Sequence, residues 1–252
     1  MRALFCIFLI LFSSIYSCKR PERSLNDSPD TNKTYNRSNS TEPRKTISRP
    51  DNVTSQSNSS TTKKTIPKSR SISDLFQELQ DEVFIIYSID RNEEVSQGSG
   101  FFIAPGIGVT NYHVLEDSEN SIISIKDEVY EITDFMESSN SSRKDYVIFR
   151  TSYRTSNPLK ISNKRPRIGE DIFAIGSPKG LSNSLTKGTI SGFRENDRIQ
   201  IDATIDHGSS GGPLFNLKGE VIGITTSGMG TGSELNFAVD IQAINYERFI
   251  NN

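Results

Sequence analysis

A serine set among glycines is the residue of this chain whose surroundings most clearly suggest chemistry. Ser210 lies in the run Gly208-Ser209-Ser210-Gly211-Gly212-Pro213-Leu214. Glycines let the backbone bend tightly and bring amide N–H groups close to a reacting carbonyl group. Such a turn can present the hydroxyl as a nucleophile while N–H groups, here those of Gly208 and Ser210, bind the developing oxyanion. The run predicts acyl transfer, with an oxyanion hole formed by Gly208, Ser209 and Ser210.

A nucleophilic serine needs a base, and the chain has only two histidines. His207 lies three residues before Ser210 in the same turn, too close for its ring to reach the hydroxyl while the backbone forms an anion hole. We expect His207 to line the site or to face solvent. His113 follows a strand-like segment in Thr110-Asn111-Tyr112-His113-Val114-Leu115 and opens a short helical turn. We therefore predict that His113 is the general base.

The third member of such a site is a carboxylate that fixes the imidazole tautomer and stabilises the imidazolium. Asp145 directly precedes the apolar run Tyr146-Val147-Ile148-Phe149, a position suited to an acid held at the start of a buried strand. Asp127 and Asp134 are alternatives by spacing alone, but neither opens such a run. We predict that Asp145 completes the triad, which gives the chain order His, Asp, Ser.

Short β-rich segments separated by turn residues surround these side chains and must position them. Ten or more such strands favour a sandwich or barrel over alternating β–α–β units. We also expect a short helix over residues 73–82, capped by Ser73, and a helix over Ile241–Ile250 packed on the outside of a barrel. The strand-like segments include Val83–Ile89, Gly100–Ala104, Ile122–Lys126, Val129–Phe135, Tyr146–Arg150, Ile172–Gly176, Leu185–Phe193, Arg198–Thr204, Val221–Thr226 and Leu235–Val239.

Four motifs together make the chain resemble trypsin-like serine proteases, in particular the HtrA/Deg group. They are Gly98-Ser99-Gly100-Phe101, Thr110-Asn111-Tyr112-His113-Val114, Lys144-Asp145-Tyr146-Val147-Ile148 and the run Gly208–Leu214. The resemblance covers roughly residues 74–245. It implies an all-β fold of two packed six-stranded barrels, with short N-terminal and C-terminal helices. It also implies that His113 and Asp145 belong to the first barrel and Ser210 to the second, and that no cofactor is needed.

The chain departs from that group in three respects. Ser209 stands where the group usually has Asn, although its backbone N–H is kept. The chain ends at Asn252, which leaves no room for the PDZ domain of most members. The loop between His113 and Asp145 is short for the lid that some members use in trans. The group commonly forms homotrimers, so a homotrimer is one assembly that the resemblance allows.

The resemblance also bears on substrate choice, because it places Thr204 at the base of the pocket for the substrate's P1 side chain. The absence of an acid there argues against Lys or Arg at P1. No histidine follows Ser210, which argues against Glu. With Ile205, Thr225 and Thr226 as walls, we predict small or medium aliphatic P1 residues.

The N-terminal segment is typical of an export signal. Arg2 precedes an apolar run from Ala3 to Leu11, which is too short to span a bilayer comfortably. The segment Ile15-Tyr16-Ser17-Cys18 resembles a bacterial lipobox, in which the cysteine is lipidated and becomes the first mature residue. Because Tyr16 is bulkier than usual, ordinary cleavage nearby and an uncleaved anchor are alternatives. We predict a signal peptide over residues 1–17 and a lipid anchor at Cys18 in the cell envelope.

The segment that follows differs sharply in composition from the rest of the chain. Residues 19–70 contain 18 Ser/Thr, 6 Asn and 5 Pro, which cannot bury enough apolar surface to fold. We predict a disordered tether over residues 18–70 and a folded domain over 71–252. The tether carries 12 Lys/Arg against 5 Asp/Glu, and the domain 16 against 26. The basic tether could lie along an anionic membrane, or its charges simply keep it soluble.

Other classes of function find less support. The folded domain is acidic and the basic residues are scattered, which argues against nucleic-acid binding. No two histidines have ligand spacing and no calcium loop is present, so no metal site is predicted. The predicted function is an endopeptidase acting on extended or misfolded polypeptides. Two alternatives stay open, namely a binding protein on a protease fold and a holdase with little catalysis.

Overall fold

A computed structural model of the chain describes residues 70–177, 183–226 and 235–250. The predicted signal peptide, Cys18 and nearly all of the predicted tether lie outside these ranges. Across the described residues, no helix is both long enough and apolar enough to cross a membrane.

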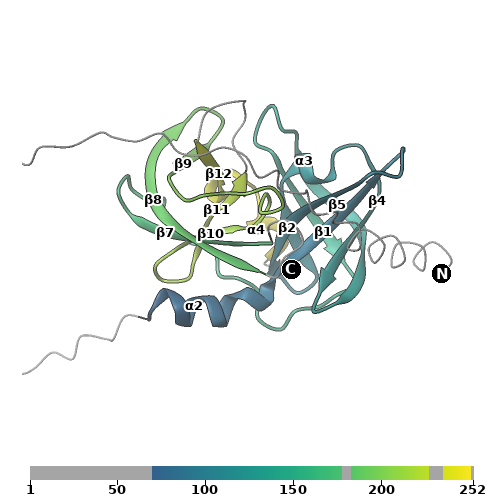
Figure 1. The fold of residues 1–252 in the computed structure, drawn as a ribbon, viewed down its shortest axis with the longest axis horizontal. Helices are drawn as coiled ribbons and strands as arrows, with labels where there is room; N and C mark the ends of the chain where they lie inside the picture. Colours follow the sequence, from purple (N-terminus) through teal and green to yellow (C-terminus); the bar gives the residue numbers. More distant parts are fainter. Residues whose placement is uncertain (1–69, 178–182, 227–234, 251–252) are drawn as a thin grey trace, which may run out of the picture. The chain divides into compact units, whose positions relative to one another are not determined.

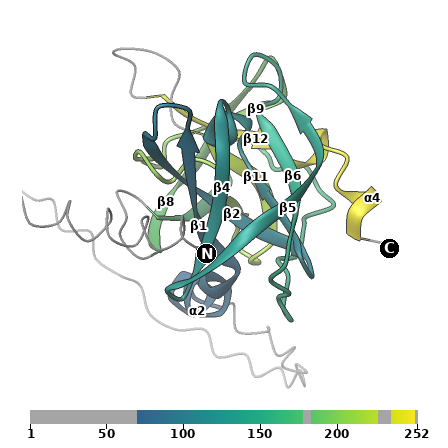
Figure 2. The same cartoon turned by 90° about the vertical axis from the view of Figure 1, so that its right-hand side faces the viewer.

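The first half of the described chain forms a closed six-stranded antiparallel barrel, drawn in blue to teal in Figure 1. Its strands neighbour one another in the order β1-β2-β3-β6-β5-β4. Figure 2, at right angles to the first view, brings β1, β2, β4, β5 and β6 of this barrel into sight. The strand bounds are β1 Val83–Asp90, β2 Val95–Ala104, β3 Ile107–Thr110, β4 Ser118–Ile125, β5 Glu128–Ser139 and β6 Tyr146–Thr151.

The second half forms another closed antiparallel barrel in the order β10-β11-β12-β9-β8-β7, drawn in green to yellow (Figure 1). The two barrels that the resemblance implied are therefore confirmed. Strand β10 was not predicted, because its four residues directly follow the glycine turn and begin with a proline, which a strand tolerates at its first position. The bounds are β7 Asp171–Gly176, β8 Ser184–Arg194, β9 Arg198–Ile201, β10 Pro213–Asn216, β11 Val221–Thr226 and β12 Asn236–Asp240.

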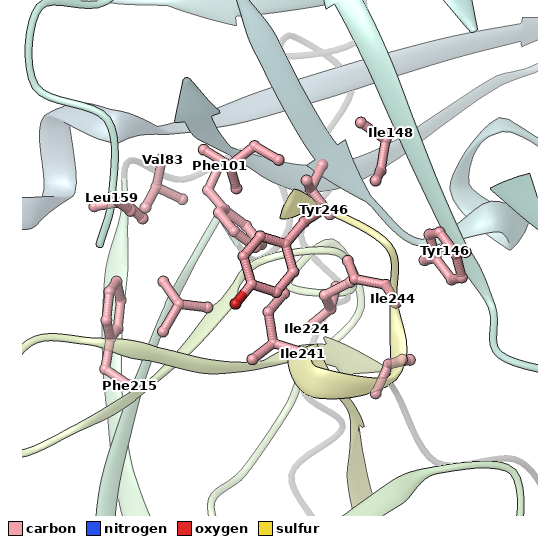
Figure 3. Packing of buried hydrophobic residues seen from close by; sticks show 14 of the residues in the cluster. Val83, Phe101, Tyr146, Ile148, Leu159, Phe215, Ile224, Ile241, Ile244 and Tyr246 are labelled. Carbon is pink, nitrogen blue, oxygen red and sulfur yellow. The ribbon is translucent and has the colours of Figure 1, made fainter. Parts of the chain in front are cut away.

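Three apolar clusters stabilise this arrangement. Phe84, Phe102 and Phe149 belong to the cluster inside the first barrel, where the rings of Phe84 and Phe102 lie 4.5 Å apart between centroids. A cluster of mainly isoleucine, alanine and leucine side chains fills the second barrel. The third draws on both barrels, and Figure 3 shows residues such as Phe101 of β2 and Phe215 of β10 within it. The two barrels thus share a core, which fixes the relative position of the strands that carry the site.

The helix before the first barrel, α2, spans Ile72–Leu79 and continues into the 3₁₀-helix η2, Gln80–Glu82. The predicted helix is confirmed, but its predicted cap is wrong. Ser71, not Ser73, is the N-cap, because its hydroxyl accepts from the Asp74 N–H at 3.1 Å and its own N–H donates to the Asp74 carboxylate at 3.2 Å. This reciprocal pair is a capping box. Leu75 of α2 is fully buried in the shared core.

The C-terminal helix predicted over Ile241–Ile250 is instead two short pieces. The 3₁₀-helix η4 spans Ile241–Ala243, and α4 spans Glu247–Ile250. Ile244 between them has extended backbone dihedrals, φ −106° and ψ 151°, which end the first piece. Ile241 and Ile244 are buried in the core that the two barrels share. Their apolar spacing therefore reflects burial at the junction of the barrels, not one face of a continuous helix.

Candidate active site

His113 lies on α3, the single helical turn Tyr112–Leu115 that follows strand β3. Asn111 precedes this turn as its N-cap residue. The buried Ser88 hydroxyl of β1 donates to the Val114 carbonyl at 2.6 Å, which ties the turn to the barrel wall. The His113 side chain is one-third exposed, at 34%. The predicted base is thus held at its backbone while its ring stays accessible.

Asp145 immediately precedes β6 with a left-handed φ of 56°, and its side chain is buried. Its carboxylate lies 2.9 Å from His113 Nδ1 and accepts from the His113 backbone N–H at 3.0 Å. The Thr226 hydroxyl of β11 donates to the same carboxylate at 3.3 Å. Asn111 Nδ2 donates to the Asp145 carbonyl at 2.9 Å. The structure therefore brings together the predicted base and the predicted acid.

The surroundings of Asp145 favour its ionised form. Burial raises the pKa of a carboxyl group, because desolvation disfavours the charge. Here the hydrogen bonds and the charge of His113, together with the hydrogen bond from Thr226, outweigh burial, and the pKa of Asp145 lies below its ordinary value. A carboxylate that stays charged beside Nδ1 stabilises a protonated imidazole.

Ser210 lies within two successive tight turns. The Ser209 N–H donates to the Asp206 carbonyl at 3.0 Å, and the Gly212 N–H donates to the Ser209 carbonyl at 3.2 Å. The third residue of each turn is a glycine with positive φ, Gly208 at 94° and Gly211 at 89°. Only glycine adopts that conformation readily, which explains the composition of the run.

The turn that carries Ser210 is fastened to the first barrel. The Ser99 N–H of β2 donates to the Ser210 carbonyl at 2.8 Å. A methyl group on Gly211 would lie 2.2 Å from both the Ser99 carbonyl oxygen and Thr110 Oγ1, and 3.2 Å from the Asn111 nitrogen. The backbone next to Ser210 therefore packs directly on the segment that leads into His113.

The predicted oxyanion hole needs one change. The Ser209 N–H forms the turn with Asp206, so its hydrogen is committed within the loop. The Ser209 amide is therefore not available to an oxyanion, which leaves the amides of Gly208 and Ser210 of the predicted set. His207 is exposed, in agreement with a loop residue that faces solvent.

The structure places the four predicted pocket residues in different surroundings, and two of them line the same cavity. Ile205 and Thr225 line a cavity of about 200 Å³ beside the Ser210 turn, together with residues of β7 and β8. Thr204 is exposed and does not line that cavity. Thr226 is buried and donates to the Asp145 carboxylate instead. Residues 227–234, which continue from Thr226, lie outside the described part of the chain.

Two contacts of this site were not foreseen in the sequence. One is the bond from Thr226 to Asp145, and the other is the set of bonds that Ser99 forms with the Ser210 turn. A serine between two glycines in Gly98-Ser99-Gly100 was a signal, because small residues in a strand mark a close approach of another backbone. Within the described ranges, no three side chains of His, Cys, Asp or Glu gather as metal ligands would.

A histidine–aspartate pair on one closed barrel, joined to a glycine-flanked serine turn on a second, defines a two-barrel serine peptidase architecture. The chain belongs to the trypsin-like peptidase domain family, whose model matches residues 98–224, about half of the chain. That range includes His113, Asp145 and Ser210.

Curated relatives of the chain carry several names. The anti-sigma-I factor RsgI9 of Acetivibrio thermocellus is 36% identical over an alignment of 158 residues, which covers 60% of this chain and 22% of that protein. The probable periplasmic serine endoprotease DegP-like of Pseudomonas savastanoi pv. phaseolicola is 36% identical over 167 residues, 60% of this chain and 34% of that protein. The serine protease HTR4 of Rattus norvegicus is 34% identical over 165 residues, 59% of this chain and 33% of that protein. The match thus spans about a fifth to a third of the length of these relatives.

Solved structures share the fold. The serine endoprotease from Yersinia pestis superposes with a TM-score of 0.60 and 29% identity, covering 69% of this chain and 64% of that chain. The active form of the Rv3671c protease from M. tuberculosis has a TM-score of 0.60 at 24% identity, covering 67% of this chain and 79% of that chain. The second likeness concerns the fold alone.

Proposed function

We propose that this chain is a serine endopeptidase that cleaves peptide bonds through an acyl-enzyme. Ser210 Oγ attacks the carbonyl carbon of the substrate while its proton passes to His113 Nε2, and the N–H groups of Gly208 and Ser210 bind the oxyanion. The C–N bond then breaks as His113 protonates the leaving amine. Water, activated by the same histidine, releases the acid and restores Ser210.

The observation that carries this proposal is the orientation of the imidazole. His113 Nδ1 lies 2.9 Å from a buried carboxylate whose pKa is lowered, so Nδ1 holds the proton and donates it to Asp145. That tautomer leaves Nε2 as the acceptor for a serine proton. The turn bearing Ser210 packs on Thr110, three residues before this histidine.

Covalent labelling with a fluorophosphonate probe tests the proposal on the full chain. The probe should modify Ser210, and the label should disappear in both Ser210→Ala and His113→Ala. His207→Ala is the matched control, because His207 is the other histidine of the chain and its side chain is exposed. Label that persists in Ser210→Ala, or that depends on His207 and not on His113, would refute the assigned roles.

For the substrate, we propose extended or misfolded polypeptides with a small or medium aliphatic side chain at P1. The support is chemical, because Ile205 and Thr225 in the cavity beside the Ser210 turn are uncharged and no histidine follows Ser210. A peptide-library cleavage profile should show Ala, Val or Leu before the scissile bond. Thr204→Asp should leave this profile unchanged, because Thr204 is exposed and does not line that cavity. Added cleavage after Lys and Arg in that variant would return Thr204 to the pocket.

A second candidate function is binding without appreciable hydrolysis. It is favoured by the 36% identity to a protein named as an anti-sigma factor, a name that describes regulation and not proteolysis. A binding protein or holdase would suppress aggregation of an unfolded client equally well as wild type and as Ser210→Ala. A peptidase would degrade the client, and Ser210→Ala would abolish that loss.

For location, we propose export and lipid anchoring at Cys18 in the cell envelope. Support comes from the lipobox-like sequence and from Pseudomonas relatives whose name includes the word periplasmic. A labelled fatty acid should be incorporated into the wild-type chain and not into Cys18→Ala, which should move to the soluble fraction. Label retained in that variant would refute lipidation at Cys18 and would leave the proposed peptidase activity unaffected.

A further inference from the structure

We propose that Ser99 is a positioning residue for the oxyanion hole, an inference that rests on the peptidase function proposed above. Ser99 lies on β2 of the first barrel and is fully buried. Its hydroxyl donates to the Gly208 carbonyl at 2.7 Å, and its backbone N–H donates to the Ser210 carbonyl at 2.8 Å. One residue of the first barrel therefore holds the carbonyls of both residues whose amides we propose as oxyanion donors.

The direction of the hydroxyl proton follows from its two partners. The Ser177 backbone N–H donates to Ser99 Oγ at 3.0 Å and can only act as a donor. The Gly208 carbonyl at 2.7 Å can only accept. The single hydroxyl proton of Ser99 is thus directed at the Gly208 oxygen, and rotation of the hydroxyl would leave that carbonyl without this bond.

This bond restrains the most flexible joint of the turn. Gly208 has no side chain and a φ of 94°, so sterics alone leave its two flanking peptide planes free to rotate. Ser99 holds the oxygen side of the following plane, and the Asp206 carbonyl holds its Ser209 N–H side at 3.0 Å. With that plane fixed at both ends, the Cα atom of Gly208 is held in place, and with it the point from which the Gly208 amide extends.

A chain of hydrogen bonds also fixes the groups that contact Ser99. The Ser177 carbonyl accepts from Gln97 Nε2 at 2.7 Å, and the Ser177 hydroxyl donates to Asn183 Oδ1 at 2.9 Å. Asn183 Nδ2 donates in turn to the Gln80 carbonyl of η2 at 2.6 Å. The Ser99 carbonyl accepts from Thr110 Oγ1 at 2.7 Å. Each polar group of Ser99 therefore has a partner, which makes it a rigid support for the turn.

The test is steady-state hydrolysis of an unfolded protein or peptide substrate by the full chain carrying Ser99→Ala. We expect kcat to fall about tenfold or more with KM little changed, because the lost interaction acts on the transition state. The affinity for a peptide boronate, which forms a tetrahedral adduct at the serine, should weaken in parallel. Ser99→Cys keeps the size of the side chain and replaces the hydroxyl by a poor donor, so kcat should again fall while the fold persists.

Ser162→Ala is the matched control. Ser162 is also buried, and its hydroxyl likewise donates to one backbone carbonyl, at 3.1 Å, and accepts from one N–H, at 3.3 Å, both of Lys164. Its removal should lower thermal stability and leave kcat and boronate affinity unchanged. Wild-type kcat in Ser99→Ala or Ser99→Cys, or an equal loss of kcat in Ser162→Ala, would overturn the inference alone. A wild-type chain that neither hydrolyses nor labels would overturn the peptidase function, and the inference with it.

Discussion

The Asp145 carboxylate binds His113 at two points, the ring nitrogen Nδ1 at 2.9 Å and the backbone N–H at 3.0 Å. The acid therefore fixes both the imidazole and the start of the helical turn that carries it. Because Asp145 is buried and its carbonyl accepts from Asn111 Nδ2 at 2.9 Å, it cannot move without disturbing that turn. Hydrogen bonds to the backbone and to the side chain of His113 thus both set the orientation of its imidazole.

The first prediction concerns Asp145→Asn. The amide can present an N–H to Nδ1, which would force the imidazole into the tautomer whose Nε2 carries the proton. We expect kcat to fall about 10⁴-fold, since that histidine can no longer accept the serine proton. The measurement is kcat on an unfolded protein substrate, together with the rate of fluorophosphonate labelling.

Asp127→Asn and Asp134→Asn are the controls for that substitution. Both residues were alternatives for the acid by spacing, and both are exposed in the structure. Each control should retain wild-type kcat, because neither carboxylate contacts His113. Activity lost in either control and kept in Asp145→Asn would reassign the acid.

The second prediction is the pH dependence of stability. Burial acts against the charge of Asp145, yet the bonds to His113 and Thr226 prevail and hold the pKa of Asp145 below its unfolded value. A carboxyl group whose folded pKa is lowered stabilises the fold above its unfolded pKa of about 3.9, and this contribution disappears as the pH falls through the folded pKa. The difference in unfolding free energy between wild type and Asp145→Asn should therefore shrink from about pH 5 downward.

Urea unfolding of both proteins between about pH 5 and pH 2 measures that difference. Other carboxylates titrate in the same range, for example Asp202 and Glu220, whose pKa values are also lowered. They are present in both proteins and cancel in the comparison. A difference that stays constant or grows toward low pH would contradict the lowered pKa of Asp145.

The sequence was sufficient to predict that His113 and Asp145 form a pair, and to predict most strands of both barrels. His113 and Asp145 lie beside segments with clear strand or turn patterns, and elements of this kind can be recognised from the local sequence alone. The same reasoning failed at Ser73, because two serines lie near the start of the helix and only the reciprocal bond with Asp74 distinguishes Ser71 as the cap.

Contacts between distant segments could not be predicted in the same way. Thr226 was expected in the substrate pocket because it follows Thr225 on one strand, but neighbouring residues of a strand point to opposite sides. Thr225 therefore binds the Ser209 carbonyl, whereas Thr226 reaches Asp145. Which side faces which partner depends on how the second barrel meets the first, and this is a property of the shared core.

The third prediction follows from that contact. Thr226→Val removes the hydroxyl that donates to the Asp145 carboxylate at 3.3 Å and preserves the shape of the side chain. We expect kcat to fall about tenfold or more, because a hydrogen bond to a charged group contributes about 1.5–3 kcal/mol. Thr226→Ser restores the hydroxyl and should recover most of the activity in the same assay. Equal kcat in the valine and serine variants would show that the bond does not contribute.

The fourth prediction compares two glycines that have nearly the same backbone conformation. Gly211, beside Ser210, has φ 89°, and Gly169, in an exposed loop, has φ 84°. A methyl group on Gly211 would lie 2.2 Å from the Ser99 carbonyl oxygen, whereas one on Gly169 would have no atom within 4 Å. Gly169→Ala should therefore cost only the backbone strain, about 1–2 kcal/mol of unfolding free energy, and keep full activity.

Gly211→Ala should cost the same strain plus the displacement of the turn from β2, for a total above about 3 kcal/mol. Because that displacement moves Ser210 away from the segment leading to His113, labelling by the fluorophosphonate should be lost even at temperatures where the variant remains folded. Urea unfolding and fluorophosphonate labelling of both variants under the same conditions distinguish the effect of backbone strain from the effect of the steric clash. Equal losses of stability and labelling in the two alanine variants would mean that positive φ alone explains the glycine at position 211. The packing of the turn on Ser99 and Thr110 would then not position Ser210.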